Sequence, residues 1–143
     1  MTNISDLSEQ YDALDKGLPL KGEEAIDASC LLSFQYEHAD QPAEMTMDSD
    51  EFTALCPWTG VPDFGTLTIK YVPNDRIIEL KSLKSYLLSF RDVGIVQEHV
   101  AGRVLKDLVA LCGPRYMEIV LDYKVRGGIH TVVRAHHGFQ GPE

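Results

Sequence analysis

The feature that most restricts the fold of this chain is a change in its hydrophobic period. Apolar and polar residues alternate over residues 66–71, which predicts a strand. Apolar residues then recur at helical spacing over residues 83–112, with one break, so we expect two amphipathic helices. Alternation returns over residues 116–124 and, after a turn at 126–128, over residues 129–135. These last two segments predict a β-hairpin.

One more strand is expected near the start of the chain. Residues 30–38 form a short apolar run that ends in alternation, and the polar residues 39–50 are interpreted as a loop. The order strand, strand, helix, helix, strand, strand predicts an α+β fold, with an antiparallel four-stranded sheet and both helices on one face. The outer strands of such a sheet carry unpaired backbone groups, and pairing with neighbouring subunits is one way to cover them.

The composition restricts the class of protein. With 143 residues we expect a single domain, residues 29–143, preceded by an acidic N-terminal arm, residues 1–28. No apolar run approaches the ~20 residues that span a bilayer, and the N-terminus lacks the basic and apolar blocks of a secretory signal, so we expect a cytoplasmic protein. The net charge of −9 argues against direct binding of nucleic acid.

Residues 51–64 combine a cysteine, the only tryptophan, two prolines and an acid. The proline after Cys56 keeps that residue out of a helix, and the density of turn residues predicts a stiff loop that can aim a side chain. Asp63 stands at the start of the next strand, where a carboxylate could hold and release a proton. A lone cysteine is more often a small buried apolar residue. Cys30, in a predicted strand, and Cys112, on a helical stripe, fit that description better than Cys56 does.

Two segments together resemble one family. Residues 79–86, Glu-Leu-Lys-Ser-Leu-Lys-Ser-Tyr, would alone be interpreted as a solvated start of a helix. They resemble the signature E-(S/L)-K-(S/A)-hydrophobic-K-(L/Y)-aromatic of the NADPH-dependent 7-cyano-7-deazaguanine reductases, the QueF family, except at Ser85. Residues 55–64 resemble the L-C-P-x-T-G-x-P-D-F segment of that family. The resemblance implies the tunnelling fold, in which subunits join their sheets into a ring with active sites between subunits.

The resemblance also implies a reaction. It is the reduction of the nitrile 7-cyano-7-deazaguanine to 7-aminomethyl-7-deazaguanine, in the biosynthesis of the tRNA modification queuosine. Cys56 would attack the nitrile carbon to form a covalent thioimide, and Asp63 would be the proton donor. Two NADPH molecules, bound in turn, would supply the hydrides. Lys81, Ser82 and Lys84 would hold NADPH, because ammonium and hydroxyl groups suit its phosphates.

Substrate binding is assigned by the same resemblance to Ile78, Glu79 and Leu80 and to Gln97 and Glu98. A carboxylate such as Glu98 can accept two hydrogen bonds from a guanine-like base. The family usually carries His-Glu where this chain has Gln97-Glu98, and a glutamine cannot carry a proton at neutral pH.

Several alternatives stay open beside this interpretation. One is a relative on the same fold that captures the nitrile on Cys56 but transfers a group other than hydride. Another is a non-catalytic ring protein that binds a deazaguanine or pterin-like base. The histidines His130, His136 and His137 lack an acidic partner at fixed spacing, so we expect no metal site.

Overall fold

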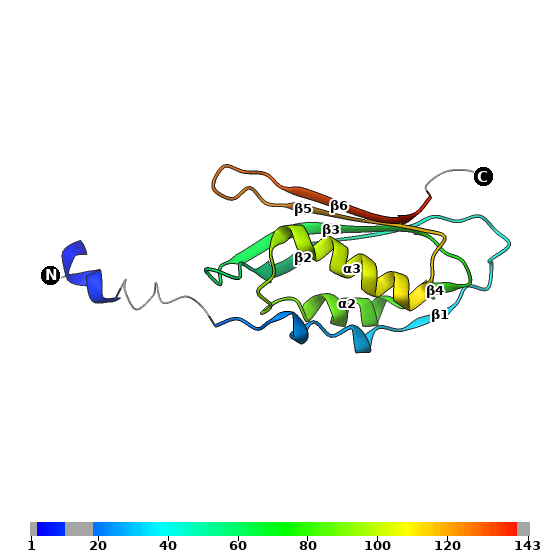
Figure 1. The fold of residues 1–143 in the computed structure, drawn as a ribbon, viewed down its shortest axis with the longest axis horizontal. Helices are drawn as coiled ribbons and strands as arrows, with labels where there is room; N and C mark the ends of the chain where they lie inside the picture. Colours follow the sequence, from blue (N-terminus) through cyan, green and yellow to red (C-terminus); the bar gives the residue numbers. More distant parts are fainter. Residues whose placement is uncertain (1–2, 11–18, 140–143) are drawn as a thin grey trace.

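The computed structural model describes residues 3–10 and 19–139. Its main layer is an antiparallel sheet of two hairpins with strand order β2-β3-β5-β6. The strands are β2 (Met45–Leu55), β3 (Pro62–Val72), β5 (Tyr116–Tyr123) and β6 (Val132–Gly138). Both helices lie on one face of this sheet (Figure 1). The predicted α+β architecture is therefore confirmed, with β2 and β6 as the outer strands.

Alternation of side chains decides which face of the sheet is buried, as the sequence pattern predicted. One face of β3 and β5 is apolar and at most 1% exposed; it carries Leu67, Ile69, Tyr71, Met117, Ile119 and Leu121. These residues lie opposite one another in the β3–β5 register. The match of apolar residues across two central strands builds the middle of the core.

The helices that cover the sheet are α2 (Leu80–Leu88) and α3 (Gln97–Cys112). Each turns an apolar stripe toward the core, and α3 ends at Gly113, as predicted. The two helices are joined by a polar contact within this apolar layer: the hydroxyl of Tyr86 donates to Asp107 Oδ2 at 2.7 Å. The arrangement places the start of α3 and the start of α2 at opposite ends of the helical layer (Figure 1).

The prediction of a loop over residues 39–50 was wrong, because β2 already begins at Met45. Met45 and Met47 are half-buried and alternate with exposed polar residues, so the period of two is present. β2 is an outer strand, and its first half carries too few apolar side chains to give a clear signal.

The strand predicted over residues 30–38 is correspondingly shorter. Cys30 lies in a 3-10 helix, η3 (Ala28–Cys30), and only β1 (Ser33–Gln35) is extended. β1 pairs with β4 (Arg76–Ile78) in a separate two-stranded sheet. The prediction that residues 30–38 form a strand of the main sheet was therefore wrong. The strand pair before the helices is β2 and β3, so the main sheet keeps the predicted order of two strands, two helices and two strands.

The N-terminal part contains two further 3-10 helices, η1 (Ile4–Leu7) and η2 (Glu23–Ala25). Ile26 contributes to the hydrophobic core. Residues 1–2 and 11–18 of the predicted arm lie outside the described residues, and the division into an arm, 1–28, and a domain, 29–143, stays a prediction. None of the helices within the described residues is long and apolar enough to cross a membrane.

Candidate active site

Cys56 follows β2 directly and begins the tight turn into β3. Its backbone N–H donates to Val61 O across that turn at 2.9 Å. The preceding residue, Leu55, is bonded to the segment that leads into α3: its N–H donates to Val93 O at 2.9 Å, and its carbonyl accepts from Ile95 N–H at 3.1 Å. The stiff loop predicted from the prolines is a hairpin turn anchored to a second segment. Cys56 is held there with only 4% of its surface exposed.

Hydrogen bonds favour the thiolate form of Cys56. Those from Thr59, followed by the backbone of Trp58 and the guanidinium of Arg126, outweigh burial and lower the pKa of the thiol from 9.0 to about 7. The Thr59 hydroxyl oxygen accepts the Val61 N–H at 3.2 Å, so its own proton is left to point at the sulfur.

The other two cysteines show the opposite behaviour. Burial raises the pKa of the Cys112 thiol to about 11. Burial, together with the charge of Asp27, also raises the pKa of Cys30. Because the thiolate is the nucleophile, Cys56 is the cysteine whose surroundings favour reactivity, and those of Cys30 and Cys112 do not.

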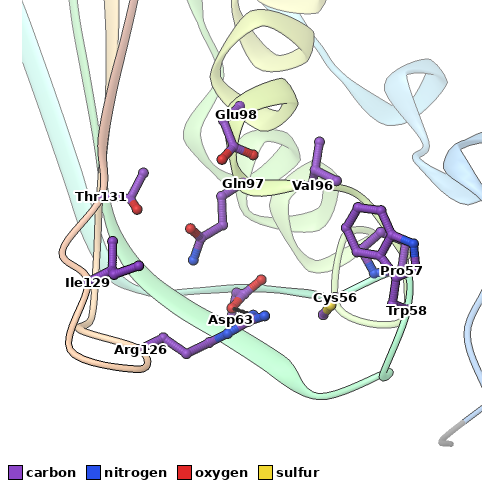
Figure 2. Close-up of a pocket in the computed structure, with 10 residues that line it drawn as sticks. All are labelled: Cys56, Pro57, Trp58, Asp63, Val96, Gln97, Glu98, Arg126, Ile129 and Thr131. Atoms are coloured by element: carbon purple, nitrogen blue, oxygen red, sulfur yellow. Dashed lines mark hydrogen bonds and ion pairs between the residues drawn. The ribbon is translucent and has the colours of Figure 1, made fainter.

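Asp63, the second residue of β3, is 6% exposed. The Thr53 hydroxyl on β2 donates to its backbone oxygen at 3.0 Å. Its carboxylate Oδ1 forms an ion pair with Nη1 of Arg126, which comes from the turn between β5 and β6 (Figure 2). A buried carboxylate beside a guanidinium is stabilised in its charged form. The ion pair places a cation beside Asp63, in the same cavity that Cys56 lines.

A cavity of about 360 Å³ brings these groups together with the start of α3. It is lined by Cys56, Pro57, Trp58, Asp63, Val96, Gln97, Glu98, Arg126, Ile129 and Thr131 (Figure 2). The backbone of Gln97 is fixed because Tyr123 OH donates to its carbonyl at 3.1 Å. Four predicted site residues, two from the hairpin and two from the helix, thus share one cavity.

The remaining predicted substrate residues lie elsewhere on the chain. Ile78, Glu79 and Leu80 line a second cavity, of about 440 Å³, between β4, β2 and the start of α2. Among residues 3–10 and 19–139, none lines both this cavity and that of Cys56. The Glu79 carboxylate also caps α2, since it accepts the N–H of Lys81 at 2.9 Å and of Ser82 at 2.7 Å. These amides lower the pKa of Glu79.

The predicted NADPH-binding residues differ in what they can offer a phosphate. Ser82 is buried, and its hydroxyl donates to Glu79 O at 2.8 Å and accepts from Leu32 N–H at 2.9 Å. Lys81 and Lys84 are exposed on the outer side of α2. Lys84 also lines a hollow of about 330 Å³ between α2 and β2, together with Arg91. The cations therefore fit a phosphate group, whereas the Ser82 hydroxyl already has two partners.

Thr59 and Arg126 are the site residues that sequence reasoning missed. Thr59 lies in the loop at 55–64 and Arg126 in the turn predicted at 126–128, but no role followed from those patterns. Within residues 3–10 and 19–139, no three His, Cys, Asp or Glu side chains form a group that could hold a metal ion.

Comparison with known proteins adds a family and a fold. The family model described as QueF-like protein matches residues 62–141. The NADPH-dependent 7-cyano-7-deazaguanine reductase of Caldicellulosiruptor bescii is 42% identical over 92% of this chain and 98% of its own. The protein of the same name from Anaeromyxobacter dehalogenans is 53% identical over 76% of this chain and 88% of its own.

A solved structure matches the fold at lower sequence similarity. The apo form of the archaeosine synthase QueF-Like superposes with a TM-score of 0.65 at 20% identity, over 71% of this chain and 99% of that one. At this identity the likeness shows the fold alone. It agrees with the tunnelling fold that the sequence resemblance implied.

Proposed function

The chain belongs to the QueF-like family, and on that premise we propose that it is an NADPH-dependent reductase of the nitrile 7-cyano-7-deazaguanine, in queuosine biosynthesis. The observation that carries the mechanism is the pairing of a low-pKa thiol, Cys56, with a buried carboxylate, Asp63, in one cavity. A nucleophile and a proton carrier are the two groups that covalent capture of a nitrile requires.

The capture of the nitrile by Cys56 needs no proton from outside the site. The sulfur of Cys56 bonds to the nitrile carbon, one C–N π bond breaks, and the nitrogen gains a proton to give the thioimide. The thiol of Cys56 supplies that proton, which passes through the carboxylate of Asp63 and leaves it charged again. The ion pair with Arg126 supports the end of this step, because a cation lies beside the carboxylate to which the charge returns.

Two NADPH molecules, bound in turn, would each supply one hydride. Two hydrides and two protons convert the nitrile to the primary amine. Lys81 and Lys84 are the residues we assign to the phosphates of NADPH, on the exposed side of α2. Ser82 supports this surface from within, because its hydroxyl bonds the Glu79 carbonyl and the Leu32 amide. No metal is needed for hydride transfer of this kind.

The separation of the two groups of predicted substrate residues supports a ring-forming homo-oligomer. Gln97 and Glu98 lie beside Cys56, whereas Ile78, Glu79 and Leu80 line a different cavity of the same chain. A complete substrate site then forms where the Cys56 cavity of one subunit meets the Glu79 cavity of its neighbour. The outer strands β2 and β6 are free in a single chain to join the sheets. We assign the protein to the cytoplasm, where a free nucleophilic thiol stays reduced.

The decisive experiment incubates the protein with 7-cyano-7-deazaguanine and NADPH and follows both cofactor absorbance and intact mass. We expect two NADPH to be consumed per nitrile, and a mass increase on Cys56 when NADPH is omitted. Cys56→Ala should lose both signals, and Asp63→Asn should bind the nitrile but lose turnover. An adduct without NADPH oxidation would indicate transfer of another group, and no adduct at all would indicate a binding protein.

A further inference from the structure

Arg126 reaches the site from the tip of the β5–β6 hairpin. Arg126 and Ile129 exchange two backbone hydrogen bonds of 3.0 Å around Gly127 and Gly128. Both glycines have positive φ, 59° and 77°, as a two-residue type I′ turn requires. A Cβ at either position would meet nothing within 4 Å, so the glycines serve the backbone conformation and not packing. The turn therefore fixes the backbone from which the Arg126 side chain extends.

From this turn the Arg126 guanidinium contacts both reactive groups. It is paired with the Asp63 carboxylate and hydrogen-bonded to the Cys56 thiol; these two contacts, the carboxylate first, raise the pKa of Arg126. The Asp63 side chain is 5% exposed, whereas that of Arg126 is 50% exposed. A carboxylate buried to this extent needs a compensating charge.

The charges around the pair explain why one cation matters so much here. Among the described residues that line the cavity, Arg126 carries the positive charge, and Glu98 at the start of α3 adds a further negative one. Tyr123 on β5 also faces this region. Burial, with the charges of Asp63 and Glu98, raises its pKa, so it stays neutral. Without Arg126, the thiolate, the carboxylate and Glu98 would repel one another across the cavity.

We propose that Arg126 is a positioning residue of the nitrile-capture step, holding the single negative charge that Cys56 and Asp63 share while the proton moves between them. This inference rests on the proposed function. In the singly protonated pair that enters the step, either Cys56 or Asp63 holds the proton, and the other group carries one negative charge near the guanidinium. When the S–C bond forms and the nitrogen takes the proton, the charge returns to Asp63, still facing Arg126.

The test compares Arg126→Met and Arg126→Lys with Lys124→Met. Lys124 is an exposed cation on the same hairpin that does not line the cavity, so its removal controls for a general loss of charge. Iodoacetamide labelling of Cys56, resolved by peptide mass spectrometry from Cys30 and Cys112, is measured against pH. The rate of nitrile adduct formation without NADPH and the melting temperature are measured beside it.

We expect Arg126→Met to label at least about two-fold more slowly at pH 7 and to reach half-maximal labelling at higher pH than the wild type. Adduct formation should fall about ten-fold or more, because the proton transfer is also affected. The labelling and adduct rates of Arg126→Lys should lie between those of the wild type and Arg126→Met, and those of Lys124→Met should equal those of the wild type. The altered pH profile separates this role from a merely structural one.

Two results would overturn the inference. One is a wild-type labelling profile in Arg126→Met, and the other is an equal shift in Lys124→Met. Failure of the proposed function is distinguishable, because the wild type would then form no nitrile adduct while the labelling profiles still decide the role of Arg126.

Discussion

Replacing Thr59 by valine tests how the structure activates Cys56. The substitution keeps the branched shape of the side chain but removes the hydroxyl, the source of the largest contribution that lowers the pKa of Cys56. Thr59→Ser is the matched control, because it keeps the hydroxyl and removes only a methyl group. The Val61 N–H loses its 3.2 Å acceptor in the valine variant and keeps it in the serine variant.

The size of the effect follows from the fraction of thiolate. A thiol with the ordinary pKa of 9.0 is about 1% ionised at pH 7, whereas Cys56, with a pKa of about 7, is about half ionised. A return of the pKa to 9.0 would thus reduce the thiolate by about 50-fold, and loss of every stabilising contact would reduce it further, because burial alone raises the pKa. Thr59→Val removes the largest contact but leaves those of Trp58 and Arg126, so the pKa should rise only part of the way. A rise of one unit would lower the thiolate at pH 7 about five-fold.

The assay is the rate of iodoacetamide labelling of Cys56 as a function of pH. The valine variant should be slower near neutral pH, and the difference should vanish or reverse above about pH 9, because a more basic thiolate is intrinsically more nucleophilic. Coinciding profiles for the wild type and Thr59→Val would refute the reasoning. An equal shift in Thr59→Ser would also refute it, since the methyl group and not the hydroxyl would then be responsible.

Two further predictions concern Glu79. Helix amides hold the pKa of Glu79 below the ordinary 4.5, so its charge stabilises the folded state fully above pH 4.5, and this contribution is lost as the pH falls through the folded pKa. Glu79→Ala should therefore unfold at a lower urea concentration than the wild type at pH 7, and the difference between the two midpoints should close in acid. A difference that does not depend on pH would contradict the capping role. The second prediction tests sites between subunits with two inactive variants, Cys56→Ala and Glu79→Gln, which are unfolded and refolded together in equal amounts. About a quarter of the mixed sites then combine an intact Cys56 with an intact Glu79 from the neighbour, so about a quarter of the wild-type activity should return. A site within one chain would recover none.

Much of the fold could be predicted because its central elements bury one face and expose the other. The periods of two over Leu67, Ile69 and Tyr71 and of 3.6 along α3 follow directly from that burial. The prediction missed the first half of β2 because an outer strand is stabilised largely by backbone pairing, here with β3. Apart from Met45 and Met47, residues 45–50 could therefore be polar.

In the site, too, residues close together in the sequence could be predicted, whereas a residue brought in by strand pairing could not. The closeness of Cys56 and Asp63 could be predicted, because they lie seven positions apart in one segment that contains two prolines. Arg126 could not, because it reaches Asp63 only through the register of β3 with β5, in which Gly65 lies opposite Tyr123. Continued by two residues, that register places Asp63 opposite residue 125, next to Arg126, and the 2.9 Å bond from Lys124 N–H to Phe64 O supports the continuation.

The register also explains why the cation comes from a turn. A side chain within β5 next to Asp63 would point above or below the sheet at a fixed position. Arg126, at the start of the two-glycine turn, lies beyond the last position of β5 that pairs with β3, and its side chain extends back over the start of β3 to the Asp63 carboxylate. The long, half-exposed Arg126 then neutralises a buried charge without being buried itself, which keeps the desolvation cost of the pair low. The hairpin tip thereby supplies the site with a cation that the apolar sheet could not hold.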